Sequence, residues 1–124
     1  VVLEVNYGEQ KFGVIHADAP IADSWESLVA RVKGGNENVL QFCLWSRESA
    51  QYGVPETLEG VDYLIHGHSV VKEPTLDKNT WFIDTGLVYG KYLTLAEVLF
   101  GELQFTKHRL CLKALSEFGF GKSE

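Results

Sequence analysis

Two histidines and an arginine are the residues of this chain whose types and placement could do chemistry. His16 directly follows an apolar run at 12–15, and His68 closely follows another at 63–65. Such runs are typical of strands, and a residue just past a strand end points into a crevice where ligands collect. Arg47 offers a planar guanidinium that suits a bidentate grip on phosphate. Together these residues indicate a site for a metal ion and an anion.

Each of these side chains also has a purely structural alternative. A lone histidine at a strand end is more often bonded to backbone than to a metal, because buried polar groups need hydrogen-bond partners. If His16 does bind a metal, its second ring nitrogen needs an acceptor, for which Asp18 is expected. The alternative for Arg47 is a helix-surface position paired with Glu48.

The segment around His68 contains a second histidine, His66, and the glycine between them. Residues two apart on a strand point the same way, but we expect a tight turn at Gly67 to break that parity. His68 is therefore favoured as the ligand, and His66 as a neighbour or a core residue. Asp84, at the end of another apolar run, could bind metal, although a turn in which it caps nearby amides is favoured.

The bulk composition narrows the classes of function. The 124 residues correspond to one domain or part of one, and the net charge of −6 argues against a nucleic-acid-binding surface. No apolar run reaches membrane-spanning length and no signal peptide is visible. Cys43 and Cys111 lie in apolar segments and are expected to be buried thiols, which fits a reducing cytoplasm. The chain contains no methionine and starts in a strand pattern, so we expect a segment of a longer protein.

The pattern of apolar residues predicts a mixture of strands and helices. Strands are predicted at 1–7, 11–15, 61–66, 70–72, 80–85 and 92–99, and 101–106 could extend the sheet. One helix is expected after a capping box at Asp23 and Glu26 and ends at Gly34, and a second is capped by Asn38 and carries Arg47 on one face. Residues 107–118 are predicted to form a terminal helix or a loosely packed tail.

Five short motifs, taken in order, resemble the calcineurin-like metallophosphoesterases, and most closely their bacterial and phage lambda-type serine/threonine protein phosphatases. The resemblance covers about residues 1–98, and Ser69 replaces the usual threonine. The motifs are His16-Ala17-Asp18, Trp45-Ser46-Arg47, Gly67-His68-Ser69, Ile83-Asp84-Thr85-Gly86 and Leu93-Thr94-Leu95. Their order and spacing are far more specific than any one of them.

The resemblance implies an α/β fold, a metallophosphoesterase-type sandwich of two mixed β-sheets flanked by helices. It implies a metal-dependent phosphomonoesterase that hydrolyses a phosphorylated protein or a small phosphoester through a centre of two divalent ions. By this resemblance His16 and His68 bind the second ion and Arg47 holds the substrate phosphate. Manganese is the ion expected, and iron or zinc is compatible with such ligands.

The family's amino-terminal motifs are absent, since this chain contains no Gly-Asp pair. Those motifs supply the bridging aspartate, the other metal ligands and the general-acid histidine, so no catalytic residue is assigned here. We therefore expect residues 1–98 to be the carboxy-terminal half of a metallophosphoesterase domain, and 99–124 an unassigned extension of it. The missing half is the expected partner, and the chain alone should bind metal weakly and turn over little or no substrate.

Two other hypotheses stay open. A diadenosine-polyphosphate hydrolase shares the metal centre of this family. A truncated scaffold or partner-binding module would have kept the sheet and lost the chemistry, and would then expose a large apolar face.

Overall fold

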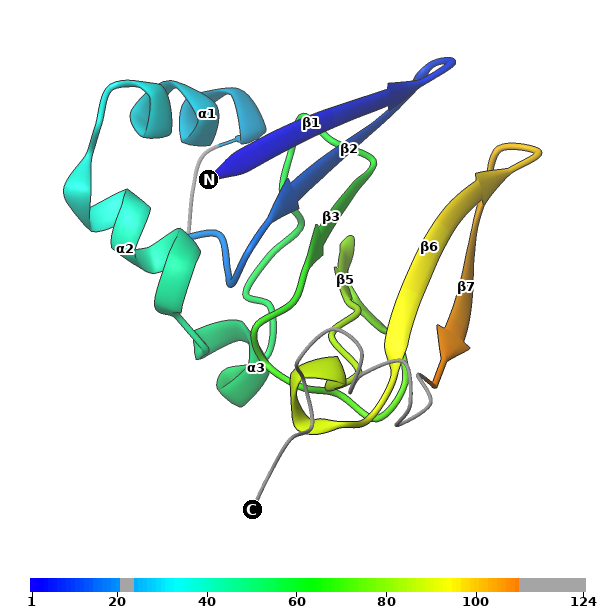
Figure 1. Cartoon of the computed structure of the whole chain (residues 1–124). Coiled ribbons are helices and arrows are strands. Elements are labelled where there is room, and N and C mark those ends of the chain that lie inside the picture. The colour runs from blue at the N-terminus through cyan, green and yellow to red at the C-terminus, as the bar shows by residue number, and fades with distance from the viewer. Residues whose placement is uncertain (21–23, 110–124) are drawn as a thin grey trace.

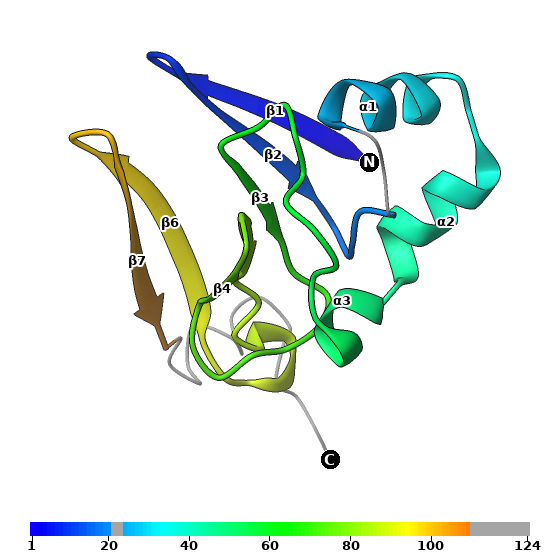
Figure 2. The same ribbon diagram turned by 180° about the vertical axis from the view of Figure 1, so that it is seen from behind.

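A five-stranded mixed sheet forms the centre of the molecule in the computed structural model, which describes residues 1–20 and 24–109. Its strands are β1 (Val2–Tyr7), β2 (Gln10–Ile15), β3 (Tyr63–His66), β4 (Thr75–Asp77) and β5 (Thr80–Phe82), in the order β1-β2-β3-β5-β4 (Figures 1 and 2). The pairs β2–β3 and β3–β5 are parallel, whereas β1–β2 and β4–β5 are antiparallel. Parallel pairing places the ends of β2 and β3 at one edge of the sheet.

Three helices lie on one side of this sheet (Figure 1): α1 (Trp25–Lys33), α2 (Glu37–Trp45) and α3 (Glu48–Tyr52). Ser24 caps α1, since its hydroxyl accepts a hydrogen bond from the Ser27 amide, and Asn36 caps α2 through the Val39 amide. The predicted cap at Asn38 was therefore wrong, since Asn38 lies inside α2. Asp23, which was predicted to cap the first helix, lies outside the described residues.

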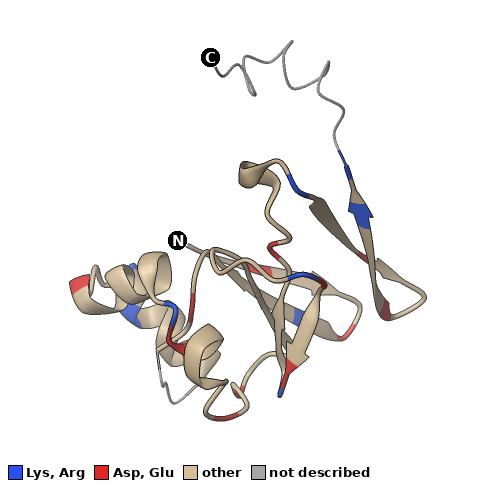
Figure 3. Ribbon diagram, turned by 90° about the horizontal axis from the view of Figure 1, so that it is seen from below, with Lys and Arg blue, Asp and Glu red and all other residues tan. Residues whose placement is uncertain are grey.

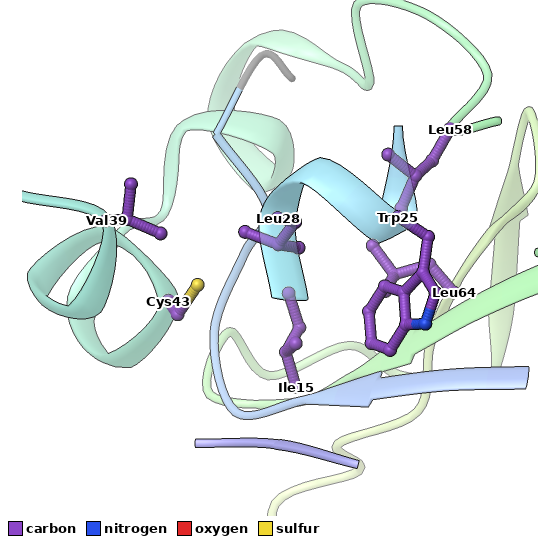
Figure 4. Packing of buried hydrophobic residues seen from close by; sticks show 7 residues of the cluster. All are labelled: Ile15, Trp25, Leu28, Val39, Cys43, Leu58 and Leu64. Atoms are coloured by element: carbon purple, nitrogen blue, oxygen red, sulfur yellow. The ribbon is translucent and has the colours of Figure 1, made fainter. Parts of the chain in front are cut away.

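The hydrophobic core lies between these helices and the sheet (Figure 4). The buried cluster consists of Ile15, Trp25, Leu28, Val39, Cys43, Leu58 and Leu64. The indole nitrogen of Trp25 donates a 2.8 Å hydrogen bond to Glu4 Oε1, which ties α1 to the edge strand β1. Cys43 is a buried free thiol, as expected. Cys111 lies outside the described residues.

A separate two-stranded sheet, β6 (Leu93–Leu99) and β7 (Glu102–His108), lies on the other side of the main sheet (Figures 1 and 2). The rings of Trp81 and Phe105 are 4.5 Å apart and join the two sheets. Trp81 pairs with Ile65, one residue along from core Leu64, so it faces away from the helices. The expected second sheet is thus present in part, but it is antiparallel rather than mixed, and β7 pairs with β6 instead of extending the main sheet.

Some local predictions were wrong in their bounds. Residues 70–72 form no strand, and the hairpin is the shorter pair β4–β5, because Lys78 at φ 53 already turns the chain. A 3₁₀ turn, η1 (Leu87–Tyr89), leads into β6. The strand β7 includes residues 107 and 108, and residues 110–118 lie outside the described residues.

Among the described helices, none is long and apolar enough to cross a membrane. Figure 3 shows Lys and Arg on α1, on β7 and in loops.

Candidate metal and phosphate site

His16 and His68 lie side by side at the edge where β2 and β3 end. Ile15 pairs with His66 in the parallel register, and the Gly67 amide donates a 3.0 Å hydrogen bond to the His16 carbonyl, which continues the alignment one step past the strands. The two imidazole ring centres are 5.0 Å apart, with the planes inclined at 56°. The sequence prediction that these two rings share one site is consistent with this placement.

Arg47 reaches the same place from the junction between α2 and α3. Its Nη1 donates a 3.2 Å hydrogen bond to the His68 carbonyl oxygen. The neighbouring Trp45, 66% exposed, meets the His68 ring edge-on, with 6.0 Å between the ring centres. The predicted position of Arg47 on the face of the second helix was wrong, since α2 ends at Trp45 and Arg47 is the residue before α3. No ion pair between Arg47 and Glu48 occurs in the described structure.

The carboxylate of Asp84 accepts hydrogen bonds from backbone amides, which is the role that the sequence favoured for it. Its Oδ2 accepts a 3.1 Å hydrogen bond from the His68 amide, and its Oδ1 accepts one of 2.9 Å from Gly86. The expected tight turn is present: the Ser69 amide donates a 2.7 Å hydrogen bond to the Gly67 carbonyl, and the residue with a positive φ, of 68, is His68. Gly67 instead makes room, since a Cβ there would lie 3.3 Å from the Asp84 Cβ.

The expected partnership between His16 and Asp18 was also wrong. Asp18 is buried, and its oxygens accept from the Ser49 amide at 2.9 Å, the Ser49 hydroxyl at 2.8 Å and the Ala19 amide at 2.9 Å. These bonds anchor the start of α3 to the loop after β2, and thereby hold Arg47 near the histidines. Sequence reasoning missed this role because Asp18 and Ser49 are 31 positions apart and neither lies in a pattern that links them.

His66 is a core residue, one of the two roles considered for it. Its ring is 2% exposed and packs edge-on against Phe82, with 4.5 Å between the ring centres. Burial lowers the pKa of His66, and the charge of Asp18 and a hydrogen bond to the Gly67 carbonyl oppose that shift. A pKa below the ordinary 6.5 leaves the ring neutral at pH 7. His66 lies on the helix side of β3, because it is two residues from the core residue Leu64.

The surroundings of His68 favour its neutral form. Desolvation lowers the pKa of its imidazole, the positive charge of Arg47 and the neighbouring His16 lower it further, and a hydrogen bond to the Trp45 carbonyl opposes them. A neutral imidazole has a free nitrogen lone pair, which is the form that binds a metal ion.

The residues present fit part of a metal site. Metal–nitrogen bonds to histidine are about 2.0–2.1 Å for zinc, and rings as close as these two can each direct a nitrogen at one ion. Catalytic sites of this kind use three or more protein ligands, and the described residues include no group of three His, Cys, Asp or Glu side chains placed to hold a metal. The pair is thus a fragment of a donor set.

An open groove of about 560 Å³ adjoins the histidines and Asp84 on the sheet face away from the helices. Its walls are mostly apolar and come from β1, β2, β3, the segment after β5 and the start of β6. They include Val1, Leu3, Val14, Ile65, Ile83 and Leu93. Thr85 lines the same groove, and its hydroxyl bonds to Thr94 at 2.7 Å, which fixes the start of β6 there.

Comparison with known proteins found no matching family model. The chain is similar to Serine/threonine-protein phosphatase 1 of Salmonella typhimurium, with 31% identity over 98 residues. The match covers 78% of this chain but 41% of that protein, so the chain spans less than half of the relative's length. This similarity supports a relationship to phosphatases.

Proposed function

We propose that this chain forms part of a metal-dependent phosphatase that hydrolyses phosphate monoesters at a two-metal centre. The observation that carries the proposal is the convergence of His16, His68 and Arg47, three residues far apart in sequence, at one edge of the sheet. The relative is a serine/threonine-protein phosphatase by name, which favours a phosphorylated protein as the substrate over a dinucleoside polyphosphate.

In this proposal each residue has a distinct task. His16 and His68 bind one of the two ions through neutral ring nitrogens, and Arg47 holds the substrate phosphate. Arg47 uses Nη1 on the His68 carbonyl, which leaves other N–H groups of its fork free for phosphate oxygens. When bound, the divalent ions supply Lewis acidity for attack on phosphorus and offset charge on the leaving oxygen. Manganese is the proposed ion, and iron or zinc also suits imidazole with carboxylate ligands.

The remaining ligands would come from a further segment that packs into the apolar groove. Two features support this part of the proposal: the relative is more than twice as long as the matched segment, and His16 and His68 line the groove together with its apolar residues. The sheet face that carries Leu3, Val14 and Ile65 is apolar. Such a face is stabilised when another layer covers it.

Calorimetric titration of the 124-residue chain with Mn²⁺ tests the metal site. We expect weak binding by the wild type that is lost in His16→Ala and in His68→Ala. His108→Ala is the matched control, because this exposed histidine lies at the end of β7 and should leave binding unchanged. Absence of heat in the wild type, or equal binding by His68→Ala, would contradict the proposal and favour a scaffold without chemistry.

The role of Arg47 can be tested by titrating inorganic phosphate into the chain with Mn²⁺ present. Arg47→Ala should weaken phosphate binding at least tenfold, whereas Arg109→Ala, at an exposed position after β7, should not. Equal phosphate affinity in the two variants would remove Arg47 from the proposed site.

A further inference from the structure

The backbone of His68 adopts a conformation that histidine rarely takes. Its φ of 68 places it in the left-handed region, in which the Cβ atom of an L residue is crowded. A residue other than glycine persists there only where its surroundings hold it. The question is therefore which groups hold His68, and what the conformation achieves.

The His68 backbone is held by its own tight turn, which a 2.7 Å hydrogen bond from the Ser69 amide to the Gly67 carbonyl closes, and by two side chains. The amide donates to Asp84 Oδ2 at 3.1 Å, and the carbonyl accepts from Arg47 Nη1 at 3.2 Å. Arg47 is exposed, whereas Asp84 is half-buried and fixed by its second oxygen on the Gly86 amide. Asp84 is thus the more rigid of the two supports.

A second observation indicates that the approach of Asp84 is specific. Asp84 packs against Gly67, the residue before His68. If Gly67 carried a Cβ, that atom would lie 3.3 Å from the Cβ of Asp84. Gly67 itself does not have a positive φ, and its carbonyl accepts the hydrogen bond that closes the turn. A Cβ there would require the Asp84 side chain to shift by a few tenths of an ångström, so the glycine eases the approach of the carboxylate to the His68 amide.

The conformation decides which way the imidazole points. Residues two apart on an extended strand share a face, so a continued β3 would send His68 to the helix side with buried His66. The left-handed residue breaks that alternation, and the His68 ring lies instead 5.0 Å from His16. We infer that Asp84 is a positioning residue of the site, whose carboxylate locks the His68 backbone so that its ring faces His16.

This inference deepens the proposed function, on which its consequence for metal binding rests, but its first test needs no metal. In the wild type, nuclear Overhauser contacts should link the His16 and His68 ring protons, and the His68 amide should exchange slowly with solvent. In Asp84→Ala we expect the ring contacts to vanish and the His68 amide to exchange at least tenfold faster.

Asp77→Ala is the matched control, since Asp77 is another half-buried carboxylate, with Oδ2 on the Val54 amide at 2.8 Å. It should lose that bond and keep the contacts between the His16 and His68 rings. Ring contacts that persist in folded Asp84→Ala would overturn the inference.

Asp84→Asn covers the case in which the alanine variant fails to fold. Its NH2 group cannot accept a hydrogen bond, so in the present arrangement either the His68 amide or the Gly86 amide loses its acceptor. We expect the ring contacts and the protection of the His68 amide to weaken together or to persist together. A folded asparagine variant that keeps full ring contacts while its His68 amide is unprotected would also overturn the inference.

Paramagnetic broadening by Mn²⁺ separates this inference from the proposed function. In the wild type both rings should broaden together; in Asp84→Ala the same broadening should need about 10- to 100-fold more Mn²⁺. If neither wild-type ring broadens, the proposed metal site fails while the ring contacts still decide the role of Asp84. If Asp84→Ala broadens at the same Mn²⁺ concentration as the wild type, the inference fails and the metal site stands.

Discussion

The indole of Trp25 occupies the space that a side chain on Gly13 would fill. A Cβ on Gly13 would lie 2.6 Å from Trp25 Cζ3 and 2.8 Å from two further ring carbons. Strand β2 can therefore approach α1 closely, and this close packing supports the strand that ends just before His16. The relationship explains why a glycine stands in the middle of a buried strand.

Gly13→Ala should destabilise the chain because the methyl group overpacks this contact. We expect a loss of about 1–3 kcal/mol in the free energy of unfolding, measured by urea denaturation. Combining it with Trp25→Phe is the control: the smaller ring should reduce the cost of the added methyl, and a double-mutant cycle reports that coupling. Strictly additive effects would show that the two residues do not compete for space.

The aromatic contact between the sheets should matter more than the ion pair beside it. Phe105→Ala removes a half-buried ring packed on Trp81 and should cost about 1–2 kcal/mol. Glu73→Gln removes the 2.6 Å ion pair with Lys107, whose groups are partly exposed, and should cost less than about 1 kcal/mol. Urea denaturation and amide exchange in β6 and β7 measure both. A larger effect of Glu73→Gln would reverse this ranking.

The buried thiol of Cys43 should make stability fall at alkaline pH. Burial, followed by the charge of Asp18, raises the pKa of Cys43 above its ordinary value of 9.0. The unfolded chain then ionises first, so the contribution is present below pH 9.0 and is lost as the pH rises through the raised folded-state pKa.

This contribution can be isolated by comparing two variants, Cys111→Ser and Cys43→Ala/Cys111→Ser. Their free energies of unfolding would be measured at pH 8 and pH 10, on either side of the ordinary thiol pKa of 9.0. The drop in stability should be smaller in the protein without Cys43, because other groups titrate equally in both. Equal drops would mean that Cys43 ionises as easily in the folded chain as in the unfolded one.

The chain alone should hydrolyse p-nitrophenyl phosphate in Mn²⁺ at a rate close to that of buffer. Two imidazoles form an incomplete donor set, and the described residues offer no third ligand beside them. His68→Ala is the control, since a rate that survives this change comes from a contaminant. Robust Mn²⁺-dependent hydrolysis that His68→Ala abolishes would show that this chain needs no further segment for catalysis.

The placement of His16 and His68 in the candidate site was predictable from the sequence, because each follows a strand. The apolar runs before His16 and His68 mark β2 and β3, and parallel neighbours end at the same edge of a sheet. The placement of Arg47 was not predictable from its own segment. It depends on where α2 ends and on the bonds from Asp18 to Ser49, which connect residues distant in sequence.

Local patterns in the sequence specified most of the helices and strands, because side-chain periodicity and caps act within a few residues. The order of the sheet and the partner of β7 depended on how whole strands pack, as the ring contact of Trp81 with Phe105 shows. At His68 the tight turn between Gly67 and Ser69 is local. The side chains that support its backbone, Asp84 and Arg47, lie 16 and 21 positions away, and folding alone brings them to its amide and carbonyl.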